Sequence, residues 1–316
     1  MKRNVILGID TSNYTTSVAL MYDDGELIAN LKRPLPVKEG EHGLRQSDAV
    51  FAHVKNIPDI MSEAKSFLSG VSPVAIGVST RPRNVDGSYM PCFLSGVAVA
   101  ESMAAALGVP LYKFSHQCGH VMAAIYSSKA FSLLDKTFAA FHVSGGTTEL
   151  LKLSFTGTEF SAELVGGTAD LNAGQVIDRV GTYLGLPFPS GKHLEELAKT
   201  NTKKIPPRKP KLSLMKINLS GLENMALKLY EETHDKPLVA AFVLDYLEKG
   251  ISSLAEAYIQ SFGHTEFLFA GGVMSNSIIR EKLKSKFKAF FAEPQFSADN
   301  AVGIAELARR SYNRSI

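Results

Sequence analysis

The order of strand-like and helical segments in the first half of the chain occurs again in the second half. Each half opens with three apolar runs of strand length. These runs cover residues 4–10, 16–22 and 26–32 in the first half and 136–144, 147–154 and 159–165 in the second. Because a three-strand opening followed by α/β segments occurs twice, the sequence indicates a duplicated α/β fold with two mixed sheets flanked by helices.

The remaining elements complete each half. The first half continues with helices near 47–68 and 94–107 and strands at 74–78 and 109–112. The second half has a long apolar helix at 237–261, strands at 266–270 and 288–292, and a final helix from Asn300. We therefore expect two lobes, residues 1–128 and 129–316, with the last helix packing on the first lobe. Ligands of such folds usually bind in the cleft between lobes.

Composition excludes several classes of protein. The 316 residues are 45% hydrophobic, which is enough for a large buried core. A net charge of +3 is too small to imply nucleic-acid binding by itself. Two cysteines, Cys92 and Cys118, provide no disulfide framework, and the chain has no apolar stretch of membrane-spanning length. We expect a cytoplasmic protein without a membrane segment.

A pair of histidines suggests a metal site. His116 and His120 are four residues apart in a predicted helix that Ser115 can cap, so both imidazoles face one side. An isolated pair is more often structural, but His142 ends a strand and offers a third ligand. Asp299 offers a fourth, although it is also well placed to cap the last helix. Nitrogen and carboxylate ligands suit either Zn or Fe, so we predict one divalent ion.

Three turns have the composition of nucleotide-binding loops. They lie at 10–13, 142–146 and 270–276, and combine hydroxyl side chains or paired glycines with strand ends. Ordinary turn chemistry explains any one of them alone. The first two lie at matching places in the two halves, which favours ligand binding. Asp178 and Gly191 could bracket a ribose.

The segment 199–216 is rich in lysine, arginine and proline and is predicted to be a loop outside the core. A solvated basic loop is one interpretation. A surface that contacts a nucleic-acid backbone is the other.

Together these motifs resemble the universal tRNA threonylcarbamoyl-adenosine transferase family, once called the glycoprotease family. The resemblance covers nearly the whole chain and rests on seven motifs in family order. They are Leu7–Ser12, His116 with His120, Val143–Gly146, Ala173–Arg179, Leu219–Leu222, Ala270–Asn276 and Asp299–Ala301. The resemblance implies the actin-like, sugar-kinase-like, Hsp70-like ATPase fold.

The resemblance also implies site residues. It makes His116, His120 and Asp299 the metal ligands, with His142 where archaeal-type members have a tyrosine ligand. The predicted nucleotide-binding residues are Ser12, His142, Val143, Ser144, Gly145, Gly146, Asp178, Gly191, Gly271, Gly272 and Asn276. The implied nucleotide is ATP, AMP or threonylcarbamoyl-AMP. The implied reaction is metal-dependent transfer of threonylcarbamoyl from threonylcarbamoyl-AMP to the adenosine beside the tRNA anticodon.

The chain departs from the family pattern at several polar positions. Asn13-Tyr14-Thr15 replaces a Cys-Asp-Glu run, Cys118 and Gln175 replace glutamates, Asp170-Leu171 replaces Asp-Asp, Thr147 replaces His or Asn, and 80–87 replaces a Gly-Pro-Gly loop. These losses suggest a divergent member or paralogue, and the sequence assigns no catalytic residue.

Three functions remain open. An acyltransferase would contact tRNA through Arg81, Arg83 and the 199–216 loop, and could need partner subunits of the same pathway. A non-catalytic, metal- and nucleotide-binding scaffold subunit is the alternative. Metallopeptidase activity is suggested only by the older family name. A metallopeptidase needs a general base, and the glutamate that could provide it is replaced by Cys118.

Overall fold

The computed structural model describes residues 2–12, 14–36 and 44–315 and divides into two compact units. Unit 1 contains residues 1–134, 155–161 and 295–316, and unit 2 contains residues 135–154 and 162–294. Each unit therefore combines segments that are far apart in the chain.

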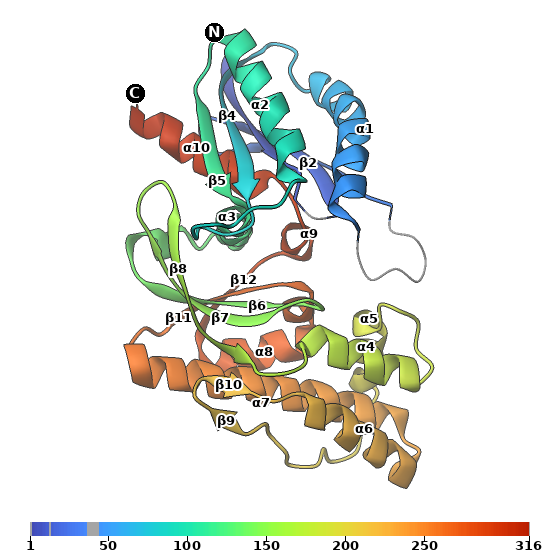
Figure 1. The fold of residues 1–316 in the computed structure, drawn as a ribbon. Helices are drawn as coiled ribbons and strands as arrows, with labels where there is room; N and C mark the ends of the chain where they lie inside the picture. Colours follow the sequence, from blue (N-terminus) through green and yellow to red (C-terminus); the bar gives the residue numbers. More distant parts are fainter. Residues whose placement is uncertain (1, 13, 37–43, 316) are drawn as a thin grey trace. The chain divides into compact units, whose positions relative to one another are not determined.

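Unit 1 is built on a five-stranded mixed sheet in the order β3-β2-β1-β4-β5 (Figure 1). Its strands are β1 (Arg3–Asp10), β2 (Thr15–Tyr22), β3 (Leu27–Pro34), β4 (Val71–Arg81) and β5 (Leu111–Ser115). Its helices are α1 (Gln46–Lys65), α2 (Phe93–Leu107), α3 (His116–Ser128) and α10 (Val302–Ser315). The short helix α9 (Pro294–Ser297) precedes α10 in the chain.

Unit 2 is built on a seven-stranded sheet in the order β12-β11-β6-β7-β8-β10-β9. Its strands are β6 (Phe138–Val143), β7 (Thr148–Phe155), β8 (Phe160–Thr168), β9 (Leu212–Ser213), β10 (Lys216–Ile217), β11 (Glu266–Ala270) and β12 (Lys288–Phe291). Its helices are α4 (Ala173–Tyr183), α5 (Gly191–Lys199), α6 (Ser220–Thr233), α7 (Lys236–Phe262) and α8 (Ser277–Lys286). The order β8-β7-β6-β11-β12 repeats that of the unit 1 sheet, which confirms the predicted duplication and the two mixed sheets.

The prediction that 199–216 is only a loop outside the core is wrong for part of the segment. β9 and β10 pair with each other, and β10 pairs in parallel with β8. Ile205 and Leu212 pack against the core of unit 2. Burial of these apolar side chains stabilises the packed segment, although its proline-rich composition suggested a loop outside the core.

One face of the unit 1 sheet packs on α1 and α2. Strand side chains alternate between faces, so Val5, Leu7 and Ile9 of β1 point to the same side. They form an apolar cluster with Ile60 of α1 and Ala100 of α2. Burial of this cluster contributes to the hydrophobic stabilisation of the unit.

The opposite face of the same sheet packs on α10. Ala19 and Met21 of β2 contact Val302 and Ala305. The helix crosses β1 where Gly8 has no side chain, because a Cβ added there would lie 2.6 Å from the Ala305 nitrogen. A small residue at this point lets the helix lie directly on the strand.

Helices α3 and α10 approach each other through two glycines. A Cβ added to Gly303 would overlap the Gly119 carbonyl oxygen, and one added to Gly119 would lie 2.9 Å from Ile304 Cδ1. This close approach brings the start of α3 to the segment that precedes α10.

The core of unit 2 surrounds α7, which is buried along most of its length. Aromatic rings from the sheet stack beside it. Phe269 lies between Phe141 and Phe291, with ring centroids 5.1 and 4.8 Å apart. The long apolar helix predicted at 237–261 is therefore a core helix.

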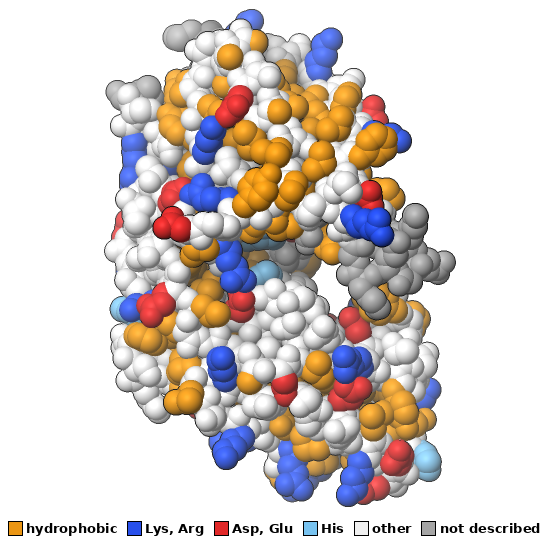
Figure 2. Space-filling view, in the orientation of Figure 1, with side chains coloured by type: hydrophobic (Ala, Val, Ile, Leu, Met, Phe, Trp, Pro, Cys, Tyr) orange, Lys and Arg blue, Asp and Glu red, His pale blue; other side chains and the backbone are white. Residues whose placement is uncertain are grey.

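No helix in the described parts of the chain combines the length and apolar character that a membrane span needs. The outer surface of α1 and α2 nevertheless carries exposed apolar side chains (Figure 2). Phe51, Val54 and Leu94 are among them.

Candidate metal and nucleotide sites

Helix α3 carries the two histidines in its first two turns. Ser115 is the N-cap, and its hydroxyl accepts a hydrogen bond from the Cys118 nitrogen, as predicted. The rings of His116 and His120 lie on one side of the helix, with centroids 4.2 Å apart. Capping fixes the helix start and therefore the position of His116.

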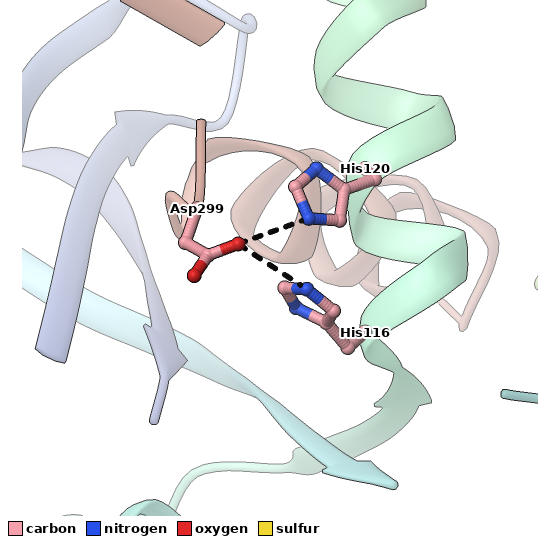
Figure 3. A group of neighbouring side chains, drawn as sticks. All are labelled: His116, His120 and Asp299. Atoms are coloured by element: carbon pink, nitrogen blue, oxygen red, sulfur yellow. Dashed lines mark hydrogen bonds and ion pairs between the residues drawn. The ribbon is translucent and has the colours of Figure 1, made fainter. Parts of the chain in front are cut away.

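Asp299 joins the histidines from the segment before α10 (Figure 3). Its Oδ1 lies 3.2 Å from His120 Nε2 and 3.5 Å from His116 Nε2. The three side chains offer ligand atoms that all lie within 4.8 Å of one another. Two imidazole nitrogens and a carboxylate oxygen converging in this way fit a divalent ion with further coordination positions left for other ligands.

Asp10 holds the other nitrogen of His116. Its Oδ1 lies 3.2 Å from His116 Nδ1, and the carboxylate also accepts hydrogen bonds from Ser12 and Ser79. A carboxylate on Nδ1 orients the ring and leaves Nε2 facing Asp299, an arrangement common behind metal-binding histidines. The sequence placed Asp10 in a phosphate-binding turn and missed this role.

The cluster strongly perturbs proton binding. Burial lowers the pKa of His116, but the carboxylates of Asp10 and Asp299 outweigh it and raise that pKa to about 10. Burial raises the pKa of Asp299, but hydrogen bonds from His116 and His120 hold it far below its usual value. Without a metal, His116 is therefore protonated at neutral pH, and a bound ion must displace that proton.

The helix-cap interpretation of Asp299 is wrong. The Asn300 side chain accepts the hydrogen bond from the Val302 nitrogen at the start of α10. Asp299 therefore does not cap α10, and its carboxylate faces His116 and His120.

The sequence also predicted ligand-binding roles for His142 and Ser12. His142 is on β6 in unit 2, and its role as a ligand stays a prediction. Ser12 is buried in unit 1, where its hydroxyl donates to Asp10, while Asn13 lies outside the described residues.

Unit 2 contains a cavity of about 530 Å³ beside the predicted nucleotide turns. Five of the predicted residues line it, namely Gly145, Asp178, Gly191, Gly272 and Asn276. Lys192, whose side chain is exposed, and Glu195 also line the cavity, and the sequence analysis did not single out either residue. The volume of the cavity and its lining by both polar and apolar residues suit a nucleotide.

The Ser-Gly-Gly turn is held by its own serine. Ser144 Oγ accepts hydrogen bonds from the nitrogens of Gly146 and Thr147, and its carbonyl accepts one from Gly174. Val143 is buried behind the turn, whereas Gly145 has open space where a side chain would be. The backbone at Gly145 is therefore accessible to a ligand.

Asn276 and Asp178 organise the walls of the cavity. Asn276 caps α8 by accepting a hydrogen bond from the Ile279 nitrogen. Asp178 accepts one from the Ser190 nitrogen at 2.8 Å. Glu195 accepts hydrogen bonds from both the nitrogen and the hydroxyl of Ser277. These hydrogen bonds hold the segments of the cavity walls together before any ligand binds.

The two glycines at 271 and 272 should respond differently to alanine. Gly271 has φ +98° and an added Cβ would overlap the Val143 carbonyl oxygen, whereas Gly272 has open space on the cavity side. We expect Gly271→Ala to lower the free energy of unfolding by about 3 kcal/mol or more. Gly272→Ala should keep its stability and weaken AMP binding. Urea unfolding and calorimetry measure both effects, and equal stability of the two variants would contradict this account.

The basic residues proposed for tRNA divide into two groups. The Arg81 guanidinium donates hydrogen bonds to Asn84 Oδ1 at 2.6 Å and to Glu159 Oε1 at 3.2 Å. Arg208, Lys209 and other basic side chains of the 199–216 loop are exposed. The loop is therefore more available for a phosphate backbone than Arg81.

His53 is a buried titratable residue that the sequence did not single out. Its Nδ1 lies 2.8 Å from Thr16 Oγ1, which also accepts a hydrogen bond from Asn56. Its Nε2 has no hydrogen-bond partner among the described residues. Burial lowers the pKa of His53 to about 4, although Asp10 and Asp299 act in the opposite direction.

This shift predicts a pH dependence of stability. Because the folded pKa lies below the unfolded value of 6.5, stability is full above pH 6.5 and falls as the pH drops toward 4. We expect a loss of about 1 kcal/mol by pH 5.5 and at most about 3 kcal/mol by pH 4. Urea unfolding between pH 7 and 5.5 should show it for the native chain and not for His53→Gln. The same slope in both proteins would assign it to other groups.

Comparison with known proteins identifies the family. The family model described as tRNA N6-adenosine threonylcarbamoyltransferase matches residues 41–306. A relative with that name from Streptococcus suis (strain 05ZYH33) is 30% identical, and the alignment covers 99% of this chain and 94% of the relative. The chain belongs to the tRNA N6-adenosine threonylcarbamoyltransferase family. Since this is a family of transferases, the expected acyltransferase class is confirmed.

Solved structures confirm the fold. Full-length HypF in its phosphate- and nucleotide-bound form is 13% identical, with a TM-score of 0.59 over 99% of this chain and 56% of that chain. The (R)-2-hydroxyglutaryl-CoA dehydratase component A of Acidaminococcus fermentans is 15% identical, with a TM-score of 0.53 over 98% and 99% of the two chains. At these identities the likeness shows the fold alone, which is the predicted actin-like, sugar-kinase-like, Hsp70-like ATPase fold.

Three of the residues that the sequence analysis compared with the family pattern make local contacts in the structure. Cys118 is buried, and its thiol contacts the Phe160 carbonyl oxygen. The Gln175 side chain accepts a hydrogen bond from the Asn172 nitrogen in a capping box. Asp170 anchors the start of α6, where it accepts hydrogen bonds from the nitrogens of Leu219 and Ser220.

Proposed function

We propose that this chain transfers a threonylcarbamoyl group from threonylcarbamoyl-AMP to the adenosine beside the anticodon of tRNA. The exocyclic amine attacks the carbamoyl carbonyl carbon, the bond to the AMP phosphate oxygen breaks, and the amine loses one proton. The observation that carries the proposal is the cluster of His116, His120 and Asp299 in a member of this transferase family.

His116, His120 and Asp299 would hold one divalent ion, Fe or Zn. Such an ion would polarise a carbonyl oxygen of the donor. Asp10 would keep His116 in the orientation that presents Nε2. His142 is proposed as a further ligand on the resemblance alone.

The cavity of unit 2 would bind the adenylate. Gly145 and Gly272 provide backbone without side chains, and Asp178, Gly191 and Asn276 provide polar groups around it. Val143, Ser144, Gly146 and Gly271 would shape the turns rather than line this cavity, and Ser12 would hold the Asp10 carboxylate in unit 1. Holding the leaving group in a preformed cavity would supply part of the rate through proximity.

The 199–216 loop would contact the tRNA backbone. Lys204, Arg208, Lys209 and Lys211 are exposed, whereas Lys203 pairs with Asp235 at 2.7 Å. Reversing the charge of Arg208 and Lys209 should weaken tRNA binding. It should also reduce the slope of the logarithm of affinity against the logarithm of salt concentration by about one for each lost phosphate contact. Reversing Lys228 together with Glu232, an exposed ion pair on α6, is the matched control. Unchanged tRNA affinity in the first variant would remove the loop from the interface.

The transfer reaction is tested by mass spectrometry of nucleosides. The purified chain is incubated with threonylcarbamoyl-AMP and unmodified tRNA, with and without the other proteins of the pathway. Threonylcarbamoyl-adenosine in the digested tRNA supports the proposal, and its absence in every mixture would refute it.

Divergence is part of the proposal. Gln175 and Cys118 stand where family members have glutamates, and both serve local structure. Catalysis would then rest on the metal cluster and on substrate positioning.

A non-catalytic scaffold is the second candidate, and one observation favours it. Phe51, Val54 and Leu94 leave an apolar surface on α1 and α2 exposed, as an interacting subunit would require (Figure 2). A scaffold would bind AMP and the ion tightly and form no product. Analytical ultracentrifugation with the other pathway proteins, run beside the mass spectrometry, separates the two functions.

A further inference from the structure

We propose that Lys32 is an anion-binding residue of the metal site, and that its ammonium holds an anionic oxygen of the acyl-adenylate donor. The inference rests on the proposed function for the identity of that donor. The donor has two anionic groups, the phosphate and the carboxylate of its threonyl part, and an ammonium suits either.

Strand register brings Lys32 to the face of the sheet where Asp10 lies. Asp10 of β1 is opposite Ser17 of β2, and Ser17 is opposite Lys32 of β3. Directly opposite residues in antiparallel strands point to the same face. Neighbouring strands are about 4.8 Å apart, so the lysine backbone is about 10 Å from Asp10. A flexible lysine side chain can cross much of that distance.

The ammonium is held near Asp299 without pairing to it. Lys32 Nζ donates to the Gln295 carbonyl oxygen at 2.5 Å, four residues before Asp299. Within the described residues Lys32 forms no ion pair with a carboxylate. An ammonium has three donors, so this bond leaves donors for a ligand oxygen.

The electrostatic surroundings also favour an anion. Burial lowers the pKa of Lys32, while the Asp299 carboxylate opposes that shift. A divalent ion would neutralise the charges of the Asp10 and Asp299 carboxylates. With the Lys32 ammonium added, the site would have a net positive charge. Lysine on an edge strand often only prevents strand pairing. Lys32 differs because its head group is turned toward Gln295 and partly removed from water.

The neighbouring residue provides a matched control. Arg33 is next in β3 and opposite Thr16, so it points to the other face. There it pairs with Glu63 of α1. Lys32→Gln and Arg33→Gln remove the same charge from adjacent positions on opposite faces.

The test measures donor binding without tRNA, so that no transfer is needed. Calorimetry gives the dissociation constants of threonylcarbamoyl-AMP, carbamoyl-AMP and AMP for the native chain, Lys32→Gln, Lys32→Arg and Arg33→Gln. We expect Lys32→Gln to weaken threonylcarbamoyl-AMP binding at least about tenfold. Lys32→Arg should restore most of it, and Arg33→Gln should stay within about twofold of the native value.

The other two ligands distinguish the anionic groups. If Lys32 holds the carboxylate, its loss weakens threonylcarbamoyl-AMP only, because carbamoyl-AMP and AMP have no threonyl part. If it holds the phosphate, all three bind more weakly. Equal affinities of Lys32→Gln and the native chain for all three would overturn the proposal.

Failure of the proposed function would look different. A native chain that binds the donor through Lys32 but forms no modified nucleoside would refute the transfer reaction and leave the role of Lys32 intact. Normal transfer by Lys32→Gln with unchanged donor affinity would refute only the role of Lys32.

Discussion

The His116→Ala variant is expected to lose divalent-ion binding and to reduce threonylcarbamoyl transfer more than about 100-fold. Loss of a residue that only orients a metal ligand costs about 10–100-fold, and His116 is itself a proposed ligand. Its Nε2 faces Asp299 and its Nδ1 faces Asp10, so removal disrupts both contacts. Metal content per chain and single-turnover product formation measure the effect.

His264→Ala is the control for this variant, because His264 belongs to unit 2, where it packs near Tyr258, and is not one of the clustered residues. It should keep its metal and its activity. Full metal content in His116→Ala would show that the ion binds elsewhere.

The Gly303→Ala variant is expected to disrupt the same site from a distance. The added methyl group would overlap the Gly119 carbonyl oxygen, so α3 and α10 would have to separate. Overpacking of this kind costs about 1–3 kcal/mol and sometimes more. Because the histidines are on α3 and Asp299 directly precedes α10, separation would also weaken ion binding. Thermal unfolding and metal titration measure both effects.

Gly221→Ala is the matched control, since Gly221 lies in α6 with open space around it. Alanine there should leave stability unchanged or raise it slightly, because glycine is the poorer helix former. A Gly303→Ala protein with native stability and native metal affinity would show that the two helices tolerate the extra methyl group.

Local sequence patterns predicted the elements of this fold well. Apolar runs of strand length located the strands, and the predicted order of strands and helices gave the duplication. The spacing of His116 and His120 and the cap at Ser115 also depend on near neighbours only, which is why the sequence could reveal them.

Contacts between distant segments could not be predicted in the same way. Asp10 and His116 are 106 residues apart, and their hydrogen bond depends on the ends of β1 and β5 lying near each other. The pairing of Lys32 with Ser17 required the strand register, and the tight contact at Gly303 required the helix packing. Asp299 illustrates the limit, because its position favoured a helix cap while Asn300 has that role.

A metal titration of the transfer reaction tests the central claim most directly. Metal-free protein receives increasing amounts of Zn²⁺ or Fe²⁺, and modified nucleoside is measured by mass spectrometry after one turnover with threonylcarbamoyl-AMP and tRNA. The account predicts that product rises in proportion to bound ion and stops rising at one ion per chain. Product that is independent of the ion, or no product from fully loaded protein with its pathway partners present, would contradict it.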